Sequence, residues 1–314
     1  MKHTDKVYIA GHRGLAGSAI WRHFEKAGYT NLVGFSSSEL DLTNRSQTLK
    51  TLRDVSPDVV IDAAAKVGGI HANNTYPAAF LSDNLQIQVN LMDAAHEAGV
   101  DRLLFLGSSC IYPKFAPQPI QESALLTGAL EATNEAYGIA KIAGILHVQA
   151  MRRQHQHHWI SAMPTNLYGP NDNYHPENSH VLAALIRKFH EAVVADSPVV
   201  EVWGTGTPLR EFLHVDDLAS AVEFLLLNYD EDDTINVGSG QEVSINELAR
   251  IIADVVGFKG ELRNNTDKPD GTPRKILDSS RLHNLGWSPR WTLREGITDA
   301  YQWFVANEGS LRSV

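Results

Sequence analysis

The sequence is poor in cysteine, in positive charge and in long apolar runs. Cys110 is the only cysteine among 314 residues, which excludes an intramolecular disulfide and a Cys-rich metal site and favours a reducing compartment. The 27 basic and 37 acidic residues give a net charge of −10, which argues against a general nucleic-acid or anionic-membrane surface. An anionic ligand would therefore have to meet locally placed positive groups.

Signals for membranes, secretion and metal binding are also missing. The polar residues 1–6 lead directly into the apolar residues 7–10 without a signal-peptide core, and nowhere do 18 apolar residues run together. The histidines at 155, 157 and 158 lack ligand spacing, so we expect no metal site. We expect a cytoplasmic protein with no membrane partner. Its length predicts a large domain with a smaller one attached.

A glycine-rich turn follows the first apolar run. Residues 11–17 have the pattern G-x-x-G-x-x-G, and behind them Ile20, Phe24 and Ala27 share one face of a predicted helix. Glycines in such a turn let backbone N–H groups and the helix N-terminus approach a pyrophosphate. A tight turn that needs positive φ would explain the glycines alone, but strand, turn and helix in this order favour dinucleotide binding.

The second apolar run, residues 32–35, lacks the acidic residue that NAD-binding units carry near the end of this strand. Three serines, residues 36–38, follow it instead. Without a carboxylate to repel it, a 2′-phosphate could be held by these hydroxyls and by Arg13, so the sequence favours NADP over NAD. The alternative is that Glu39 or Asp41 fills the acidic role.

Further apolar runs predict strands at residues 59–62, 102–106 and 159–163, and a long helical pattern covers about 78–98. Alternating strands and helices indicate an α/β fold, with a Rossmann-type doubly wound parallel sheet in a domain of residues 1–170. We expect that sheet to end near residue 170. Residues 171–314 are expected to form mainly a smaller C-terminal α/β substrate domain, with some segments able to return to the first. Capping boxes predict helices that start at Ser244 and Thr292.

Tyr137 and Lys141 lie four residues apart in a helical pattern and so share one face. A nearby ammonium favours the phenolate, and the pair suits a proton donor to a carbonyl. Ser108 and Cys110 follow the predicted strand 102–106, at the edge where such sheets bind ligands. From the residues alone, a half-buried Tyr beside a solvated Lys, and a small buried Cys, remain open alternatives.

In this order, the turn at 11–17, Ser108 and the Tyr137–Lys141 pair resemble the extended short-chain dehydrogenases/reductases. Six further stretches make nearly the whole chain similar to the GDP-L-fucose synthase family: AAKVGGI at 64–70, GSSCIYP at 107–113, MPTNLYGP at 163–170, NSH at 178–180, REFLHVDD at 210–217 and KPDG at 268–271. That family inverts carbons 3 and 5 of GDP-4-keto-6-deoxy-D-mannose and reduces the carbon 4 ketone with NADPH. The resemblance implies that substrate or a close GDP-sugar, NADP(H) as cofactor, and a homodimer through the helices near 78–98 and 133–153.

The resemblance also implies roles for individual residues. Ser108 and Tyr137 would stabilise the oxyanion, Cys110 and His180 would be the acid-base pair, and Lys141 would hold the cofactor ribose and tune Tyr137. Cofactor contacts would fall on Gly11, His12, Arg13, Gly14, Leu15, Ala16, Gly17, Ser37, Lys141, Pro164, Thr165, Asn166, Leu167 and His180. Substrate contacts would fall on Lys188, Trp203, Arg210 and Asp270. Lys188 stands where the family commonly shows Arg, so bidentate geometry is lost there. Ser37 stands where some members have an Arg for the 2′-phosphate, which weakens the expected preference for NADP.

Four alternatives compete with this interpretation. An epimerase that recycles tightly held NAD is disfavoured by Cys110 and His180. A non-catalytic dinucleotide sensor is disfavoured because the whole set of Ser108, Cys110, Tyr137, Lys141 and His180 is retained. An epimerase-reductase for another GDP-4-keto sugar and a 4-ketoreductase without epimerase activity both stay open.

Overall fold

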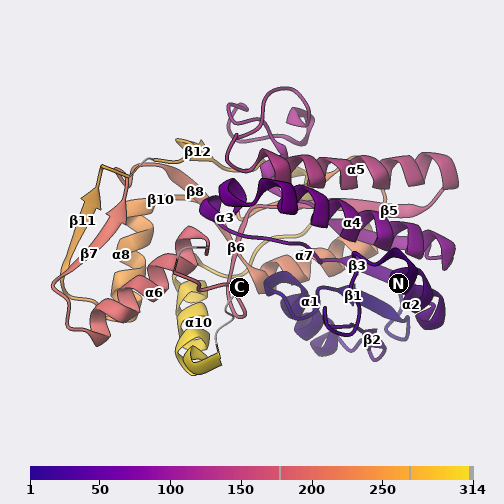
Figure 1. Cartoon of the computed structure of the whole chain (residues 1–314), viewed down its shortest axis with the longest axis horizontal. Coiled ribbons are helices and arrows are strands. Elements are labelled where there is room, and N and C mark those ends of the chain that lie inside the picture. Colours follow the sequence, from indigo (N-terminus) through magenta and orange to yellow (C-terminus); the bar gives the residue numbers. More distant parts are fainter. Residues whose placement is uncertain (177, 269, 311–314) are drawn as a thin grey trace.

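The computed structural model describes residues 1–176, 178–268 and 270–310, which form two lobes (Figure 1). The larger lobe is built on a six-stranded parallel sheet of order β2-β1-β3-β4-β5-β9. Because β2 and β3 lie on opposite sides of β1, a crevice opens at the carboxyl ends of β1 and β3. The strands are β1 (Val7–Ala10), β2 (Leu32–Val33), β3 (Val59–Asp62), β4 (Arg102–Leu106), β5 (His158–Pro164) and β9 (Ile235–Val237).

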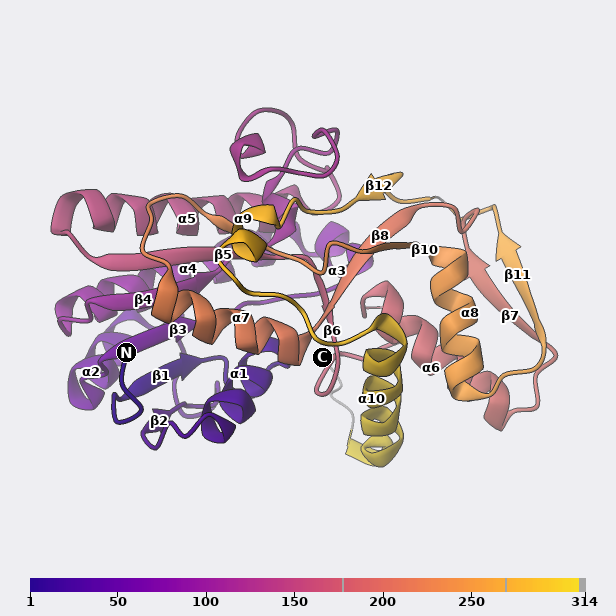
Figure 2. The same cartoon turned by 180° about the vertical axis from the view of Figure 1, so that it is seen from behind.

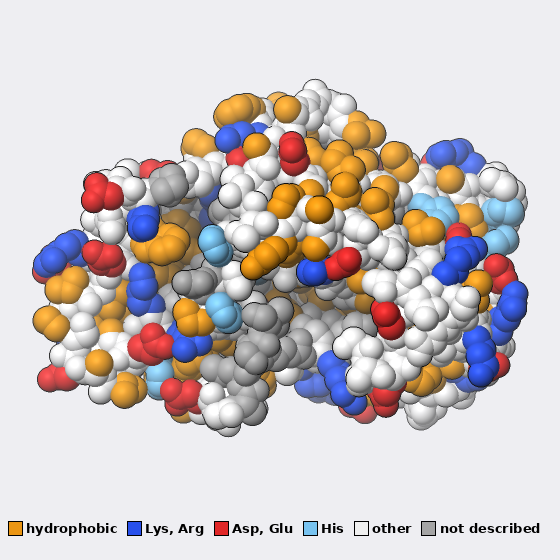
Figure 3. All heavy atoms as spheres, in the orientation of Figure 1, with side chains coloured by type: hydrophobic (Ala, Val, Ile, Leu, Met, Phe, Trp, Pro, Cys, Tyr) orange, Lys and Arg blue, Asp and Glu red, His pale blue; other side chains and the backbone are white. Residues whose placement is uncertain are grey.

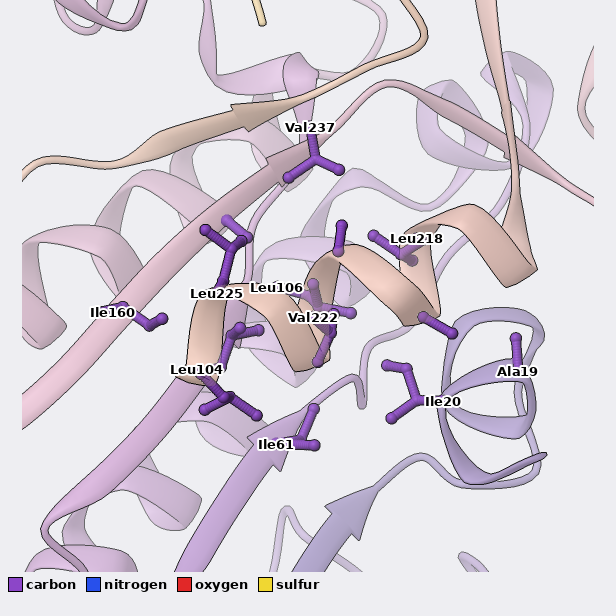
Figure 4. Close-up of a cluster of buried hydrophobic side chains, with 14 of the residues drawn as sticks. Ala19, Ile20, Ile61, Leu104, Leu106, Ile160, Leu218, Val222, Leu225 and Val237 are labelled. Atoms are coloured by element: carbon purple, nitrogen blue, oxygen red, sulfur yellow. The ribbon is translucent and has the colours of Figure 1, made fainter. Parts of the chain in front are cut away.

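The sheet is buried on both faces, as its near-continuous apolar strands predict. Helices α1 (Leu15–Lys26) and α7 (Val215–Asn228) cover one face, and α2 (Arg45–Val55), α4 (Pro77–Glu97) and α5 (Glu135–His155) cover the other. Figure 2 views the molecule from the α7 side. In Figure 4, Leu218 and Val222 of α7 lie over the sheet residues Ile61 and Leu104. Each such side chain contributes roughly 1.5–3 kcal/mol of hydrophobic stabilisation.

The expectation that the parallel sheet ends near residue 170 is wrong. β9 adds a strand beyond β5, with Ile235 opposite Ala162. α7 packs against α1, and Leu282 of the short helix α9 (Ser280–Asn284) joins the same core. β9 is only three residues long, too short for an alternating pattern to reveal it. The α/β fold class with a parallel central sheet is confirmed.

The smaller lobe holds β8 (Leu209–His214), which pairs with β6 (Asn166–Tyr168), β10 (Glu242–Ser244) and β12 (Arg274–Lys275). A second pair joins β7 (Val199–Trp203) to β11 (Glu261–Asn265). Helices α6 (Val181–Val194), α8 (Ile245–Val256) and α10 (Leu293–Ala306) share this lobe's core. The capping boxes at Ser244 and Thr292 are confirmed at the starts of α8 and α10.

The short helices are α3 (Ile70–Thr75), η1 (Ser109–Ile111), η2 (Glu122–Ala124) and η3 (Glu308–Ser310). Within the described ranges, no helix combines the length and apolar character that a membrane crossing requires.

Candidate active site

The glycine-rich turn connects β1 to α1 at the crevice of the sheet. Gly11 has a φ of 75°, and a Cβ there would lie 2.7 Å from the Ala63 carbonyl oxygen. A Cβ on Gly17 would lie 2.1 Å from the Gly11 carbonyl oxygen. Gly14 precedes α1 and supplies no side-chain cap, so the first N–H groups of this helix are available to a ligand. A glycine cradle at a helix N-terminus fits the pyrophosphate of a dinucleotide.

A carboxylate does lie just beyond β2, although the serines precede it in the sequence. Glu39 Oε2 accepts hydrogen bonds from the Ser36 N–H at 2.7 Å and from Ser36 Oγ at 2.5 Å. These bonds, and the nearby charge of Arg13, lower the pKa of Glu39. Arg13 therefore interacts with the alternative acidic residue, while Ser37 is exposed beside it.

Tyr137 and Lys141 both lie on the buried side of α5, one turn apart. Lys141 Nζ is 6.0 Å from the centroid of the Tyr137 ring and donates a hydrogen bond to the Leu106 carbonyl oxygen at 2.8 Å. Burial raises the pKa of Tyr137, Cys110 raises it further, and a side-chain hydrogen bond with Ser108 opposes both. The expectation that the ammonium would favour a phenolate is therefore wrong, and Tyr137 is a neutral phenol that can donate a proton.

Lys141 also lies near a buried carboxyl group that we did not anticipate. Burial lowers the pKa of Lys141 to about 8, while the charge of Asp62 raises it. Asp62 ends β3 and is fully buried, which raises its own pKa to about 6 against the lowering effect of Lys141. One Asp62 oxygen accepts the Ala64 N–H at 3.2 Å, and the other has no hydrogen-bond partner among the described residues. The only sequence signal was a carboxylate that closes an apolar run.

Cys110 lies in η1, the turn that Ser108 caps by accepting the Cys110 N–H at 3.2 Å. Cys110 is partly exposed. Its Sγ accepts hydrogen bonds from Asn134 Nδ2 at 3.3 Å and from Lys275 Nζ at 3.8 Å. Cys110 also packs against the cluster of Ala72, Phe80 and Tyr137. The thiol thus has both polar and aromatic neighbours, unlike an inert cysteine in a purely apolar core.

His180 is the N-terminal cap residue of α6 and is exposed. The segment before it is held against Gly69, whose N–H donates to the Asn178 carbonyl oxygen at 2.8 Å. A side chain at Gly69 would clash with the Ser179 carbonyl oxygen, at 2.6 Å. The surrounding protein, and then the ammonium of Lys275, lower the pKa of His180. Lys275, which the sequence analysis did not single out, therefore acts on both Cys110 and His180.

The four predicted substrate residues lie in the smaller lobe. Lys188 Nζ is 5.8 Å from the centroid of the exposed Trp203 ring, and Lys268 Nζ is 5.3 Å from it. Asp270 accepts the Thr205 N–H at 2.9 Å, and its charge acts on the half-buried Arg210. β12 places Lys275 opposite Arg210, so the substrate set and the catalytic set meet along β8.

The loop after β5 passes between the two lobes. The Thr165 N–H donates to the Val237 carbonyl oxygen at 3.0 Å, and Asn166 Nδ2 donates to the Glu211 carbonyl oxygen at 2.7 Å. Pro164 ends β5, and Leu167 packs against the core of the larger lobe. The structure fixes where these residues lie, and their contacts with a cofactor stay a prediction.

Comparisons with known proteins identify close relatives. Residues 7–238 match the model of the NAD dependent epimerase/dehydratase family. GDP-L-fucose synthase 1 of Arabidopsis thaliana is 61% identical over 97% of this chain and 94% of its own length. GDP-L-fucose synthase of Escherichia coli (strain K12) is 52% identical over 98% of this chain and 99% of its own. A solved structure of a GDP-L-fucose synthetase from Naegleria fowleri bound to NADP is 26% identical, with a TM-score of 0.92 over 100% of this chain and 98% of its own.

These relatives confirm three expectations from the sequence. The chain is an NADP-dependent epimerase/reductase, its cofactor is NADP(H), and its substrate is a GDP-sugar. The roles of individual site residues stay predictions. Since the family model spans most of the chain and relatives at more than half identity cover nearly all of it, the chain belongs to the NAD-dependent epimerase/dehydratase family and, within it, to the GDP-L-fucose synthases.

Proposed function

We propose that this chain converts GDP-4-keto-6-deoxy-D-mannose to GDP-L-fucose by inverting carbons 3 and 5 and reducing the ketone at carbon 4. The observation that carries the proposal is that Lys275 acts on both the Cys110 thiol and the His180 imidazole, while Cys110 packs against the cluster that contains the Tyr137 phenol. Epimerisation needs the first two groups, and reduction needs the third. A reducing compartment such as the cytoplasm suits the free thiol.

Epimerisation begins with removal of a proton next to the ketone. Cys110, as thiolate, takes the hydrogen from carbon 3 or 5, and the bonding electrons move to the carbon 4 oxygen. Ser108 and Tyr137 stabilise that oxyanion as hydrogen-bond donors. His180, as imidazolium, returns a proton on the opposite face and becomes neutral. Its lowered pKa supports this step, because it makes the imidazolium a stronger acid.

Reduction uses the same oxygen-binding groups. When bound in the glycine cradle, NADPH supplies the hydride for carbon 4. Tyr137 gives its proton to the carbon 4 oxygen, and the ammonium of Lys141 then stabilises the phenolate that forms. The raised pKa of Tyr137 supports a donor that holds its proton until the oxygen becomes basic.

The charges of the smaller lobe suit the GDP part of the substrate. Lys188 and Arg210 supply two cations, and the exposed ring of Trp203 supplies a flat apolar surface. A diphosphate pairs with the cations, and a base stacks on the ring. The carboxylate of Asp270, which hydrogen bonds from Thr205 hold in place, favours the charged form of Arg210.

We also propose a homodimer that forms through α4 and α5. These two helices lie side by side on the outside of the larger lobe (Figure 1), and Figure 3 shows apolar side chains gathered in that region. Val89 on α4 is 37% exposed, and Ile139 and Leu146 on α5 are 48% and 41% exposed. Contiguous apolar surface of this kind is typical of a protein interface.

The decisive experiment is a reaction in D₂O. The protein is incubated with GDP-4-keto-6-deoxy-D-mannose and NADPH, and the product is identified by NMR and mass spectrometry. We expect GDP-L-fucose with deuterium at carbons 3 and 5. A product with another hydroxyl configuration would contradict the proposed substrate or stereochemistry.

The Cys110→Ser variant separates the two chemistries. A hydroxyl cannot replace a thiolate as base, whereas the ketone still fits beside Tyr137. We expect hydride transfer to persist, with a 6-deoxy sugar that is not epimerised and carries no deuterium at either carbon. If this variant incorporates deuterium at the wild-type rate, Cys110 is a packing residue and the epimerase assignment to it fails.

A further inference from the structure

Lys275 is held firmly between the two lobes. Its strand, β12, pairs with β8, so Lys275 lies opposite Arg210. The next N–H groups are anchored as well: Ile276 donates to Gln118 Oε1 at 3.0 Å and Leu277 to Glu211 Oε2 at 3.0 Å. The preceding side chain, Arg274, is engaged elsewhere, with two hydrogen bonds to Glu242 at 2.7 and 2.9 Å. The backbone thus fixes where the Lys275 side chain begins.

The ammonium of Lys275 reaches the proposed epimerisation groups. Nζ lies 3.8 Å from Cys110 Sγ. Desolvation is the larger cause of the lowered pKa of His180, and the charge of Lys275 lowers it further. Within residues 1–176, 178–268 and 270–310, no carboxylate lies within 4.0 Å of Nζ. The ammonium is therefore not neutralised by a partner, and its field acts on the sulfur.

The other groups around Cys110 cannot take over this task. Besides Lys275, the described residues in contact with Cys110 include Ser108, Asn134 at the N-terminal cap of α5, and the cluster that contains Tyr137. Burial raises the pKa of Tyr137, and Ser108 and Asn134 have no charge. Lys275 is thus the one described cation placed against the sulfur.

We propose that Lys275 is a positioning residue for epimerisation, whose ammonium stabilises the Cys110 thiolate. The effect follows from a positive charge 3.8 Å from a sulfur that must become negative. Even in water, a unit charge at about 4 Å favours its opposite roughly fivefold, and less solvent makes the effect larger. The proposal rests on the proposed function only for the use of the thiolate as base.

Alkylation of the thiol tests this without any sugar. Because Cys110 is the only cysteine, the mass shift of the intact protein with iodoacetamide reports this residue alone. The ratio of the rate at about pH 7 to the plateau rate at high pH measures the thiolate fraction and cancels differences in access. We expect this ratio to fall about fivefold or more in Lys275→Met and in Lys275→Gln.

Two variants serve as controls. Lys275→Arg keeps the charge, and we expect it to keep most of the wild-type ratio. Arg274→Met removes a neighbouring cation of the same strand whose side chain bonds to Glu242, and we expect an unchanged ratio. In D₂O with substrate, the charge-free variants should also lose deuterium incorporation at carbons 3 and 5 near neutrality and regain part of it at higher pH.

The outcomes separate the roles that Lys275 could have. If Lys275→Met keeps the wild-type alkylation ratio and only raises KM for the GDP-sugar, Lys275 is a substrate-binding residue and the proposal fails. If both charge-free variants lose their circular dichroism, Lys275 is structural and the proposal fails as well. Failure of the wild-type protein to convert the GDP-sugar would contradict the proposed function alone, because the alkylation result uses the free protein.

Discussion

At the scale of single residues, burial outweighs neighbouring charge at the proposed reduction site. The Lys141 ammonium is 6.0 Å from the Tyr137 ring, yet burial dominates and the pKa of Tyr137 rises. The neutral phenol that results suits the proposed role of Tyr137 as proton donor. In the proposed reduction, Lys141 acts on the phenolate that forms and not on the resting phenol.

Tyr137→Phe is expected to abolish most of the reduction. The change removes the proton donor and keeps the aromatic packing against Ala72 and Phe80. General acids typically contribute on the order of 10²–10⁴-fold, so single-turnover oxidation of NADPH should slow by a factor in that range. A loss below about tenfold would show that Tyr137 is structural and would direct attention to Ser108.

Asp62→Asn is expected to shift the alkaline limit of activity. The pKa of Lys141 is about 8, and the carboxylate of Asp62 raises it, so removal of that carboxylate lowers it. The fraction of charged Lys141 then falls at a lower pH than in the wild type. In a profile of kcat/KM against pH, the alkaline limb should move to lower pH and the acid limb should stay. An unmoved alkaline limb would mean that Lys141 charge does not control the rate.

At the scale of elements, the sequence predicted the parts that form long patterns. The strands around Val60 and Leu104 and the long helix α4 were expected because their apolar runs are continuous or helical, whereas the length of α5 was expected from the family resemblance. β2 is only two residues long, shorter than predicted, and β9 was not predicted. Strands of two or three residues are too short to show a recognisable hydrophobic pattern. The order of the glycine turn, Ser108 and the Tyr-Lys pair indicated where the site lies.

The rest of the site depends on contacts between distant segments. Lys275 meets Cys110 across 165 positions, and Glu211 meets Leu277 across 66. No spacing rule within one segment reveals such pairs. Asp62 was not predicted as a site residue, because no feature of the nearby sequence indicates that it interacts with Lys141. Tertiary burial also reversed the expected effect on Tyr137, which sequence spacing alone could not show.

Gly17→Ala is expected to damage the cofactor turn. A Cβ at Gly17 would lie 2.1 Å from the Gly11 carbonyl oxygen, so the first turn of α1 must move. We expect a clear fall in Tm and at least about tenfold weaker NADPH binding by fluorescence titration. Gly14→Ala is the matched control for stability. Its Cβ would lie 3.2 Å from the Gly11 carbonyl oxygen, and its φ of −77° suits any residue. Equal Tm losses would contradict the packing argument.

At the scale of the whole molecule, the chain passes between the two lobes several times. The pairing of β12 with β8 places Lys275, which contacts Cys110, opposite Arg210, one of the predicted substrate residues. Movement of the smaller lobe therefore moves Arg210 and Lys275 together. The proposed dimer uses the outer faces of α4 and α5 on the larger lobe (Figure 1), whereas the predicted substrate residues lie in the smaller lobe.

The double change of Ile139 and Leu146 to Glu is expected to yield monomers. It places two charges on the exposed apolar face of α5, where burial in an interface would be costly. Sedimentation velocity measures the outcome. Val194→Glu is the control, because Val194 is 74% exposed on α6 in the other lobe. A wild-type protein that sediments as a monomer would contradict the interface itself.

The late return of α7 and β9 to the larger lobe has a consequence for the order of synthesis. The hydrophobic core that α1 shares with α7 includes Val222 and Ile235. It also includes Leu282 and Trp287, and the ribosome adds these two residues after most of the smaller lobe. Until then, the nascent N-terminal half keeps uncovered the part of that sheet face on which α7 packs in the folded protein. A fragment that stops at residue 170 would keep that face exposed permanently and would depend on chaperones or aggregate. The two lobes therefore mature together, late in translation, and not one after the other.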